Sequence, residues 1–203
     1  MSSRSNWIEI VVITGRAGSG KTTLAAWLRD FHGAHVYSMA NVLKRIAADT
    51  LGFRASQLYG DPVSKETEDE RIGMSPRRFL QLLGSSVQAN FGADTLPRGT
   101  IKAIEESPFF KAGEIFVVDD CRYPLEKAMF KAMENENRGV RVHTVKVVNP
   151  QQGPLNPEHE HSSESSVDLI GAEYTFSNLK GLEGPSKLFH DFSNKVPGPW
   201  SLI

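Results

Sequence analysis

Residues 8–14, IEIVVIT, are followed without a break by residues 15–23, GRAGSGKTT. The first stretch is rich in Ile and Val, which is typical of a parallel β-strand buried on both faces. The second contains the complete pattern G-x-x-x-x-G-K-[ST], and residues 21–31 have the apolar spacing of a helix. Because a glycine-rich loop between a buried strand and a helix is the context that this pattern requires, the sequence predicts a phosphate-binding loop.

The glycines of such a loop let backbone N–H groups converge on phosphate oxygens, and the helix N-terminus adds its dipole. Lys21 is expected to reach the β- and γ-phosphates of a nucleoside triphosphate, and the Thr22 hydroxyl to bind Mg²⁺. A chance glycine-rich turn is the alternative, and the flanking strand and helix argue against it. The residues predicted to bind the triphosphate are Gly15, Arg16, Ala17, Gly18, Ser19, Gly20, Lys21, Thr22 and Thr23.

Composition and charge exclude several classes of protein. The 203 residues suffice for one α/β domain, which we expect to span residues 1–203. The formal net charge is −1 without a strongly basic block, which disfavours standing nucleic-acid binding. Cys121 is the only cysteine, so an intrachain disulfide is excluded and a reducing cytosol fits. No stretch approaches the ~20 apolar residues that span a bilayer, so we expect a cytoplasmic protein without membrane association.

Strand-like and helix-like segments alternate along the chain, which predicts an α/β fold with a parallel sheet and right-handed crossovers. Strands are expected at 7–14, 35–39, 114–119, 140–148 and 173–178, and helices at 21–31, 40–51, 75–91, 124–137 and 182–192. Ser75 and Pro76 form a strong helix start. Inward-facing stripes are expected at Val42, Leu43, Ile46 and Ala47, and at Phe79, Leu80, Leu83, Val87 and Phe91.

Two polar segments interrupt this alternation. Residues 54–74 are charged and contain Gly and Pro, so we expect a mobile excursion rather than a core element. Residues 149–166 form a second long polar stretch.

Charged side chains follow the third expected strand. Asp119 and Asp120 stand at its end, where a carboxylate beside the glycine loop can hold magnesium through water. We favour Asp119 as the metal residue, and the alternative is that one of the pair caps the turn before the next helix. Arg122 follows at the carboxyl edge of the sheet, where doubly wound folds bind ligands.

Phosphoryl transfer also needs positive charge around the acceptor. Arg77 and Arg78 open a helix, where side chains and helix dipole can act on one anion. Lys44 lies on the helix after the second strand and could face the same cleft. For each of these residues the alternative is a solvated surface charge.

The order of the motifs resembles the bacteriophage deoxynucleoside monophosphate kinase family from about Ile10 to Phe192. The motifs are GRAGSGKTT, SMANVLKRIA, LYGDP, SPRRFLQLLG, VVDDCRYPLE, HSSE and YTFSNLKGLE. Taken individually, only the phosphate-binding loop GRAGSGKTT is highly specific. The combination of PRRFLQLLG and DDCRYPLE is what separates this family from other P-loop kinases. The resemblance implies a three-layer P-loop kinase fold with a parallel sheet of about five strands and a mobile lid, which would be residues 149–166. It implies transfer of the ATP γ-phosphate to a deoxynucleoside 5′-monophosphate.

The resemblance also implies roles for single residues. Lys21, Asp119 and Arg122 would be catalytic. Arg77 and Arg122 would clamp the acceptor phosphate, and Gln81, whose amide offers both donor and acceptor, would approach the base. His161, with Glu164, would act from the lid-like loop, and its alternative is an exposed loop histidine. Asn178 would lie near the ATP adenine, or else be a strand-end turn residue.

The chain departs from the family at the lid. Asn149 stands before Pro150 where relatives commonly carry an arginine, and residues 147–166 contain no Lys or Arg. We therefore expect the lid's positive charge to come from Arg122, Arg16 or a residue of 54–74.

Two other functions stay open. One is a P-loop kinase acting on a modified base in DNA or on another small-molecule acceptor. The other is an NTPase switch without an acceptor, which would leave the acceptor-side arginines without a role. The sequence does not identify the base, and it leaves the oligomeric state open, a homodimer included.

Overall fold

The computed structural model describes residues 6–151, 165–179 and 184–200. The chain divides into two compact units, the first formed by Met1–Ser38 with Pro97–Ile203 and the second by Met39–Leu96. Each unit is described by itself.

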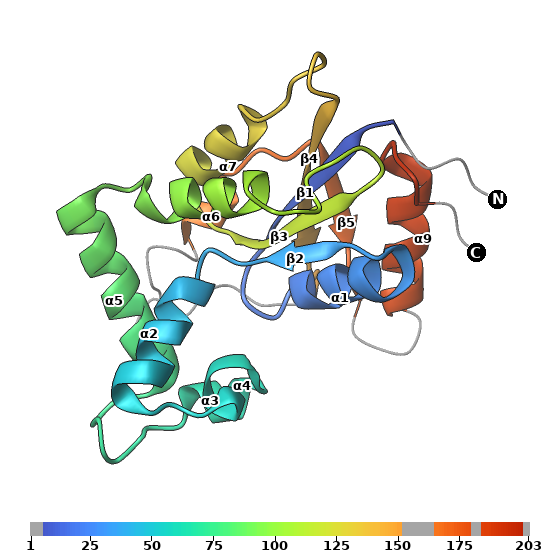
Figure 1. Cartoon of the computed structure of the whole chain (residues 1–203). Helices are drawn as coiled ribbons and strands as arrows, with labels where there is room; N and C mark the ends of the chain where they lie inside the picture. Colours follow the sequence, from blue (N-terminus) through green and yellow to red (C-terminus); the bar gives the residue numbers. More distant parts are fainter. Residues whose placement is uncertain (1–5, 152–164, 180–183, 201–203) are drawn as a thin grey trace. The chain divides into compact units, whose positions relative to one another are not determined.

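The first unit is built on a five-stranded sheet in which every pair of neighbouring strands is parallel (Figure 1). The strands lie in the order β2-β3-β1-β4-β5. Their bounds are β1 Ile8–Thr14, β2 His35–Tyr37, β3 Ile115–Cys121, β4 Val140–Val148 and β5 Tyr174–Ser177. The predicted α/β fold with a parallel sheet is therefore confirmed.

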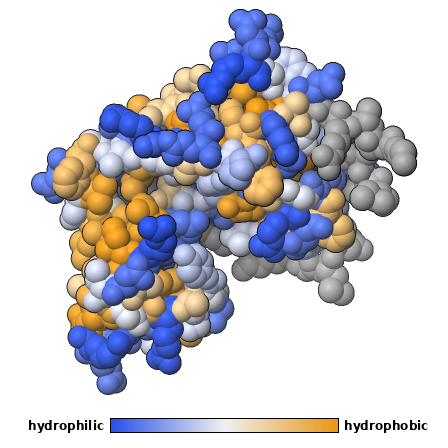
Figure 2. Space-filling view, in the orientation of Figure 1, coloured by the Kyte–Doolittle hydropathy of each residue, from blue (hydrophilic) through white to orange (hydrophobic). Residues whose placement is uncertain are grey.

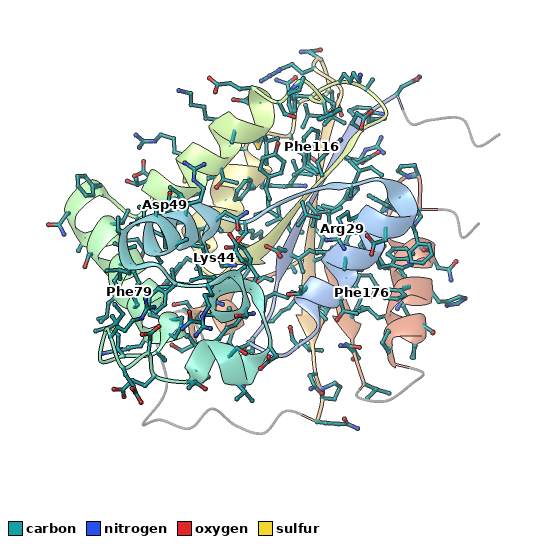
Figure 3. The ribbon with its side chains drawn as sticks, turned by 60° about the horizontal axis from the view of Figure 1, so that its bottom comes forward. Arg29, Lys44, Asp49, Phe79, Phe116 and Phe176 are labelled. Carbon is teal, nitrogen blue, oxygen red and sulfur yellow. The ribbon has the colours of Figure 1, made fainter. Side chains whose placement is uncertain are left out.

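Helices cover both faces of this sheet. Figure 1 shows α1 (Lys21–His32) and α9 (Gly184–Lys195) on one face, and α6 (Thr95–Glu105) and α7 (Pro124–Lys131) on the other. Alternate residues of a strand point to opposite faces, and accordingly Val11 and Ile13 of β1 pack in one core with Leu24 of α1 and Phe192 of α9. Every residue of β1 is buried, as expected for a central parallel strand. Phe116 of β3 and Phe176 of β5, labelled in Figure 3, are buried in the same sheet.

β1 carries one buried charge. The Glu9 side chain has 0% exposure, and its carboxylate lies 2.9 Å from Nε2 of His143 and 3.3 Å from Nη1 of Arg141. The Arg141 guanidinium stacks over the Trp7 ring at 4.3 Å. Because a buried carboxylate is tolerated when it is paired and hydrogen-bonded, these contacts explain how Glu9 fits an apolar strand.

The second unit is helical and consists of α2 (Asn41–Leu51), α3 (Ala55–Tyr59), α4 (Pro62–Glu66) and α5 (Pro76–Phe91). Its core joins Ala47, Phe53 and Leu58 to Phe79 and Leu80. Leu58 is 2% exposed, so the prediction that residues 54–74 contain no core element is wrong. The mobility of this segment stays a prediction.

The ends and faces of the helices differ in part from expectation. Ser75 Oγ accepts the backbone N–H of Arg78 at 3.3 Å, which confirms the predicted cap of α5. Phe91 is 74% exposed, however, and Val42 and Ile46 are exposed as well, so they do not face inward. A Cβ added to Gly84 of α5 would lie 3.3 Å from Leu43 Cδ1, so α2 turns Leu43 toward α5. Val42 and Ile46, which directly precede Leu43 and Ala47 in α2, consequently point in another direction than Leu43 does. Figure 2 shows hydrophobic surface over these helices.

α6 was not predicted, and α7 is shorter than predicted. α6 contains Pro97 and Gly99, which are unfavourable inside helices, but proline is tolerated in a first helical turn. α7 ends at Lys131 rather than at 137: Asn135 Oδ1 accepts the Arg138 N–H at 3.0 Å, and Gly139 at φ +63° leads the chain into β4. None of the helices among the described residues is long and apolar enough to span a bilayer.

Candidate active site

The glycine-rich loop joins the carboxyl end of β1 to α1 and depends on its glycines for shape. Gly15, Gly18 and Gly20 have φ values of +147°, +73° and +107°, which L side chains rarely adopt. A Cβ on Gly15 would lie 2.3 Å from the Val147 carbonyl oxygen, and one on Gly20 would lie 2.1 Å from Asn178 Nδ2. Backbone conformation and close approach therefore both require glycine at these two positions.

Lys21 holds its ammonium group over this loop. Its Nζ donates to the carbonyl oxygens of Gly15 at 2.6 Å and Arg16 at 2.8 Å, and the residue is 8% exposed. The N-cap of α1 is Gly20, which offers no side-chain cap, and the first turn has no acidic residue. Uncapped N–H groups beside a buried cation form a site suited to an anion.

Three buried polar atoms around the loop have no hydrogen-bond partner among the described residues. They are Thr14 Oγ1, Ser19 Oγ and Asn178 Oδ1. Buried polar groups in proteins are normally paired, and the exceptions concentrate where a ligand or water completes them. Their grouping at one loop is consistent with a polar ligand there.

An ionic cluster lies beside the loop. Arg16 forms an ion pair with Asp168 of η2 (Val167–Leu169). Lys146 of β4 has its Nζ 3.8 Å from the same carboxylate and donates to the Val167 carbonyl oxygen at 3.1 Å. The hydrogen bond from Arg16, helped by the charges of Arg16 and Lys146, lowers the pKa of Asp168.

Sequence reasoning did not single out Lys146. In the sheet it pairs with Thr14, the last residue of β1 before the loop. This position can be deduced only once β4 is known to neighbour β1. The order of the strands, and no local sequence pattern, therefore identifies Lys146 as a neighbour of the loop.

The aspartate pair lies at an irregularity of the sheet. Val12 pairs with Val118 while Thr14 pairs with Cys121, so β3 has one more residue than β1 between these pairs. This is a β-bulge, a feature that re-aims side chains and is frequent beside active sites. Asp120 Oδ2 accepts a hydrogen bond at 2.6 Å from Oγ of Ser38, the residue that follows β2. The assignment of Asp119 to magnesium stays a prediction.

Arg122 is fixed through its backbone. Glu126 Oε2 accepts the backbone N–H groups of Arg122 at 2.7 Å and Tyr123 at 3.0 Å, at the start of α7. Glu126 is 4% exposed, and burial, with a smaller contribution from the charge of Asp120, raises its pKa to about 7. Burial, with the nearby acidic charges, also raises the pKa of the Cys121 thiol far above its ordinary value. Cys121 is therefore an unreactive core residue.

The predicted acceptor residues other than Arg122 and His161 lie in the second unit. Arg77 Nε forms an ion pair with Glu66 Oε1 at 2.7 Å, and Arg78 is exposed. Lys44, labelled in Figure 3, lies over the Tyr59 ring with its Nζ 4.5 Å from the centroid. Gln81 is half-buried on α5. His161 and Glu164 lie outside the described residues.

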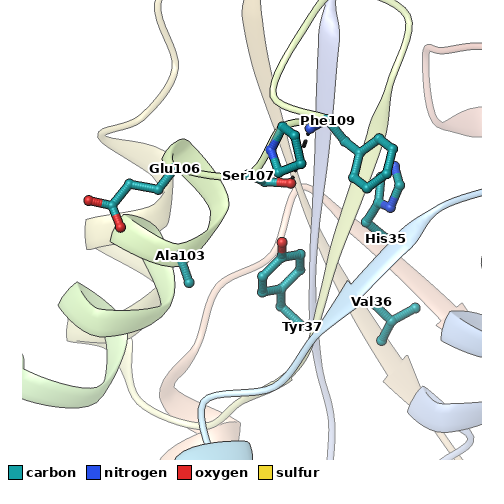
Figure 4. Close-up of a pocket in the computed structure, with 8 residues that line it drawn as sticks. His35, Val36, Tyr37, Ala103, Glu106, Ser107 and Phe109 are labelled. Atoms are coloured by element: carbon teal, nitrogen blue, oxygen red, sulfur yellow. Dashed lines mark hydrogen bonds between the residues drawn. The ribbon is translucent and has the colours of Figure 1, made fainter.

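A separate hollow of about 560 Å³ lies along β2 in the first unit (Figure 4). In it His35 stacks on Phe109 with ring centroids 4.4 Å apart, and Nε2 of His35 lies 3.0 Å from Glu114. None of the predicted site residues lines this hollow; its lining is His35, Val36, Tyr37, Ala103, Glu106, Ser107, Pro108 and Phe109.

Comparison with known proteins gives a partial match. No family model matches the chain. A protein of Acanthamoeba polyphaga mimivirus named "Putative deoxynucleotide monophosphate kinase" is 34% identical over 89 residues, which are 43% of this chain and 46% of the viral protein. The match thus spans about half the length of this relative. The bacteriophage family indicated by the motifs stays a prediction.

Two solved structures are also similar. TT1252 from Thermus thermophilus is 17% identical, with 95% of this chain and 100% of that chain covered and a TM-score of 0.47. A mutant of the APS kinase CysC from Mycobacterium tuberculosis is 18% identical, with 81% and 95% covered and a TM-score of 0.32. Both scores lie below 0.5, so the class follows from this chain's own strand order and loop. It is a P-loop α/β protein.

Proposed function

We propose that this protein transfers the γ-phosphate of ATP to a deoxynucleoside 5′-monophosphate, giving ADP and the deoxynucleoside diphosphate. The donor half rests on the complete phosphate-binding loop and its buried lysine. The acceptor half rests on one observation, the 34% identity over 89 residues to a viral protein that bears this name.

On the donor side, Lys21 would exchange its two carbonyl partners for oxygens of the β- and γ-phosphates. The loop and the first turn of α1 would donate backbone N–H groups to the same phosphates. Preorganised donors of this kind stabilise the charge that develops during transfer and contribute several kcal/mol. Arg16 would add a second cation at the edge of the loop, where Asp168 orients it.

The residues present fit a magnesium ion. Mg²⁺ prefers oxygen ligands and usually takes one or two from the protein, the remainder being phosphates and water. Thr22 supplies a hydroxyl and Asp119 a carboxylate. The described residues contain no group of three His, Cys, Asp or Glu that could hold a metal ion by themselves, so phosphate and water would have to supply the remaining ligands. Thr22 and Asp119 would hold the ion, which when bound would neutralise charge on the transferring phosphate.

On the acceptor side, Arg122 and Arg77 would grip the monophosphate. Arg77 would have to exchange Glu66 for phosphate, and a guanidinium binds phosphate bidentately as it binds carboxylate. Gln81 would contact the base, Lys44 and Arg78 would add positive charge around the acceptor, and His161 would contact the substrate.

The test is ADP formation from ATP with each deoxynucleoside 5′-monophosphate, 5-substituted pyrimidines included, with oligonucleotide DNA, and without any acceptor. Formation of ADP and a deoxynucleoside diphosphate in equal amounts, dependent on one or a few monophosphates, supports the proposal. ADP formation that is the same without acceptor would instead indicate an NTPase. Dependence on DNA alone would indicate a kinase for a base in DNA.

A further inference from the structure

The phosphate-binding loop is contacted at both ends by residues at the carboxyl ends of other strands. At its start, the Val147 carbonyl oxygen of β4 lies where a Gly15 side chain would begin. At its end, the Asn178 amide lies where a Gly20 side chain would begin, with Nδ2 at 2.1 Å and Cγ at 2.9 Å from that position. The first contact is made by backbone and the second by a side chain, so the second can be removed by mutation.

Asn178 is itself held firmly. It follows β5 directly, and its backbone N–H donates to the Val148 carbonyl oxygen at 2.8 Å. Its side-chain Nδ2 donates to the Ser19 carbonyl oxygen at 3.1 Å. Its Oδ1 has less than 1 Å² of exposed surface, so a base arriving from solvent does not meet this oxygen.

The hydrogen bond to Ser19 sets the orientation of one peptide group. In a trans peptide the C=O of one residue and the N–H of the next lie in one plane and point in opposite directions. When Asn178 binds the Ser19 oxygen, the Gly20 N–H must therefore point away from Asn178. Gly20, with φ at +107°, belongs to the residue type that most easily permits this peptide to flip, so a fixed partner is needed to keep one orientation.

We propose that Asn178 is a positioning residue that locks the Ser19–Gly20 peptide, so that the Gly20 N–H is presented to bound phosphate. Asn178 then supports the phosphates of any nucleoside triphosphate and does not select adenine. This inference rests on the donor half of the proposed function, the binding of a triphosphate, and is independent of the acceptor.

The experiment compares Asn178→Ala and Asn178→Asp with wild type. Asn178→Asp keeps the shape but replaces the donor by an oxygen that repels the Ser19 carbonyl. Ser177→Ala is the matched control, because Ser177 is the exposed preceding residue. Dissociation constants are measured by calorimetry for ATP, GTP and inorganic tripolyphosphate, which has no base, and KM for ATP is measured beside kcat.

Loss of one hydrogen bond should weaken binding of all three ligands by a common factor of roughly 2 to 12 in Asn178→Ala. Asn178→Asp should lose more, and Ser177→Ala should match wild type. A loss confined to ATP, with GTP and tripolyphosphate unchanged, would show an adenine contact and overturn the proposal. Unchanged affinities in both variants would overturn it as well. The ratio of the ATP affinity to the tripolyphosphate affinity is measured within one variant, so partial unfolding of that variant does not affect this ratio.

Two further outcomes separate this inference from the proposed function. Wild-type protein that binds neither ligand would contradict the donor half of the function, and this inference with it. Wild-type protein that binds both but phosphorylates no monophosphate would contradict the acceptor half alone and leave this inference supported.

Discussion

Replacement of Glu126 by Gln should remove a pH dependence of stability that the wild-type protein carries. The Glu126 carboxylate is buried at the start of α7, and burial raises its pKa from 4.5 to about 7. Gln is close to the shape of the protonated acid, and its Oε1 can still accept the backbone N–H groups of Arg122 and Tyr123.

The magnitude follows from the shift in pKa. A rise from 4.5 to about 7 is about 2.5 units, and at 1.36 kcal/mol per unit the ionised form costs the folded protein roughly 3 kcal/mol. Because the pKa is higher in the folded than in the unfolded chain, the folded protein binds more protons between these two values. The contribution of Glu126 to stability is therefore complete below pH 4.5 and lost as the pH rises through about 7.

The assay is urea unfolding at intervals from pH 5 to pH 8, followed by tryptophan fluorescence. We expect Glu126→Gln to gain on wild type as the pH rises, by up to roughly 3 kcal/mol at pH 8. The exposed Glu136→Gln serves as control and should keep a constant difference from wild type. If the curves of Glu126→Gln and wild type run parallel over this range, the Glu126 side chain is not ionised at a cost in the folded state, and the reasoning fails.

Three further predictions concern the phosphate site. Lys21→Ala should lower the rate of transfer by about 10²- to 10³-fold while the circular dichroism spectrum is kept, because its ammonium stabilises developing charge; normal turnover would reject the donor assignment. Asp119→Asn should raise the magnesium concentration needed for half-maximal activity more than Asp120→Asn, since Asp120 is hydrogen-bonded to Ser38; the opposite order would exchange their roles. Arg77→Ala and Arg122→Ala should each raise KM for the monophosphate by roughly 10- to 150-fold with little change in ATP affinity. Arg→Lys should restore only part of the loss, and unaltered acceptor kinetics in both alanine variants would mean that the acceptor is misidentified.

The parts of the fold that the sequence predicted are those with local signals. The apolar run of β1, the glycines after it and the helical spacing from Lys21 lie within 25 residues, so pattern alone places the loop. The cap of α5 was equally local, because Ser75 and Pro76 act on their own first turn. No helix was predicted at α6, where Pro97 and Gly99 are locally unfavourable to a helix.

The remainder depends on which strands become neighbours. Lys146 joins Arg16 at Asp168 only because β4 lies beside β1, and Asn178 reaches Gly20 from the end of β5. The high pKa of Glu126 requires knowledge of its burial, which a glutamate at the start of a helix does not indicate. Partners distant in sequence decide the first two features, and burial on folding decides the third.

The path of the γ-phosphate tests the central claim most directly. Wild-type protein is given ATP labelled at the γ-phosphate, magnesium and each deoxynucleoside 5′-monophosphate in turn, and the labelled products are separated. The account predicts that with its acceptor the label passes into the deoxynucleoside 5′-diphosphate, one label for each ADP formed, and that Lys21→Ala forms both products about 10²- to 10³-fold more slowly. Label released as inorganic phosphate at a rate independent of the monophosphate would contradict the account.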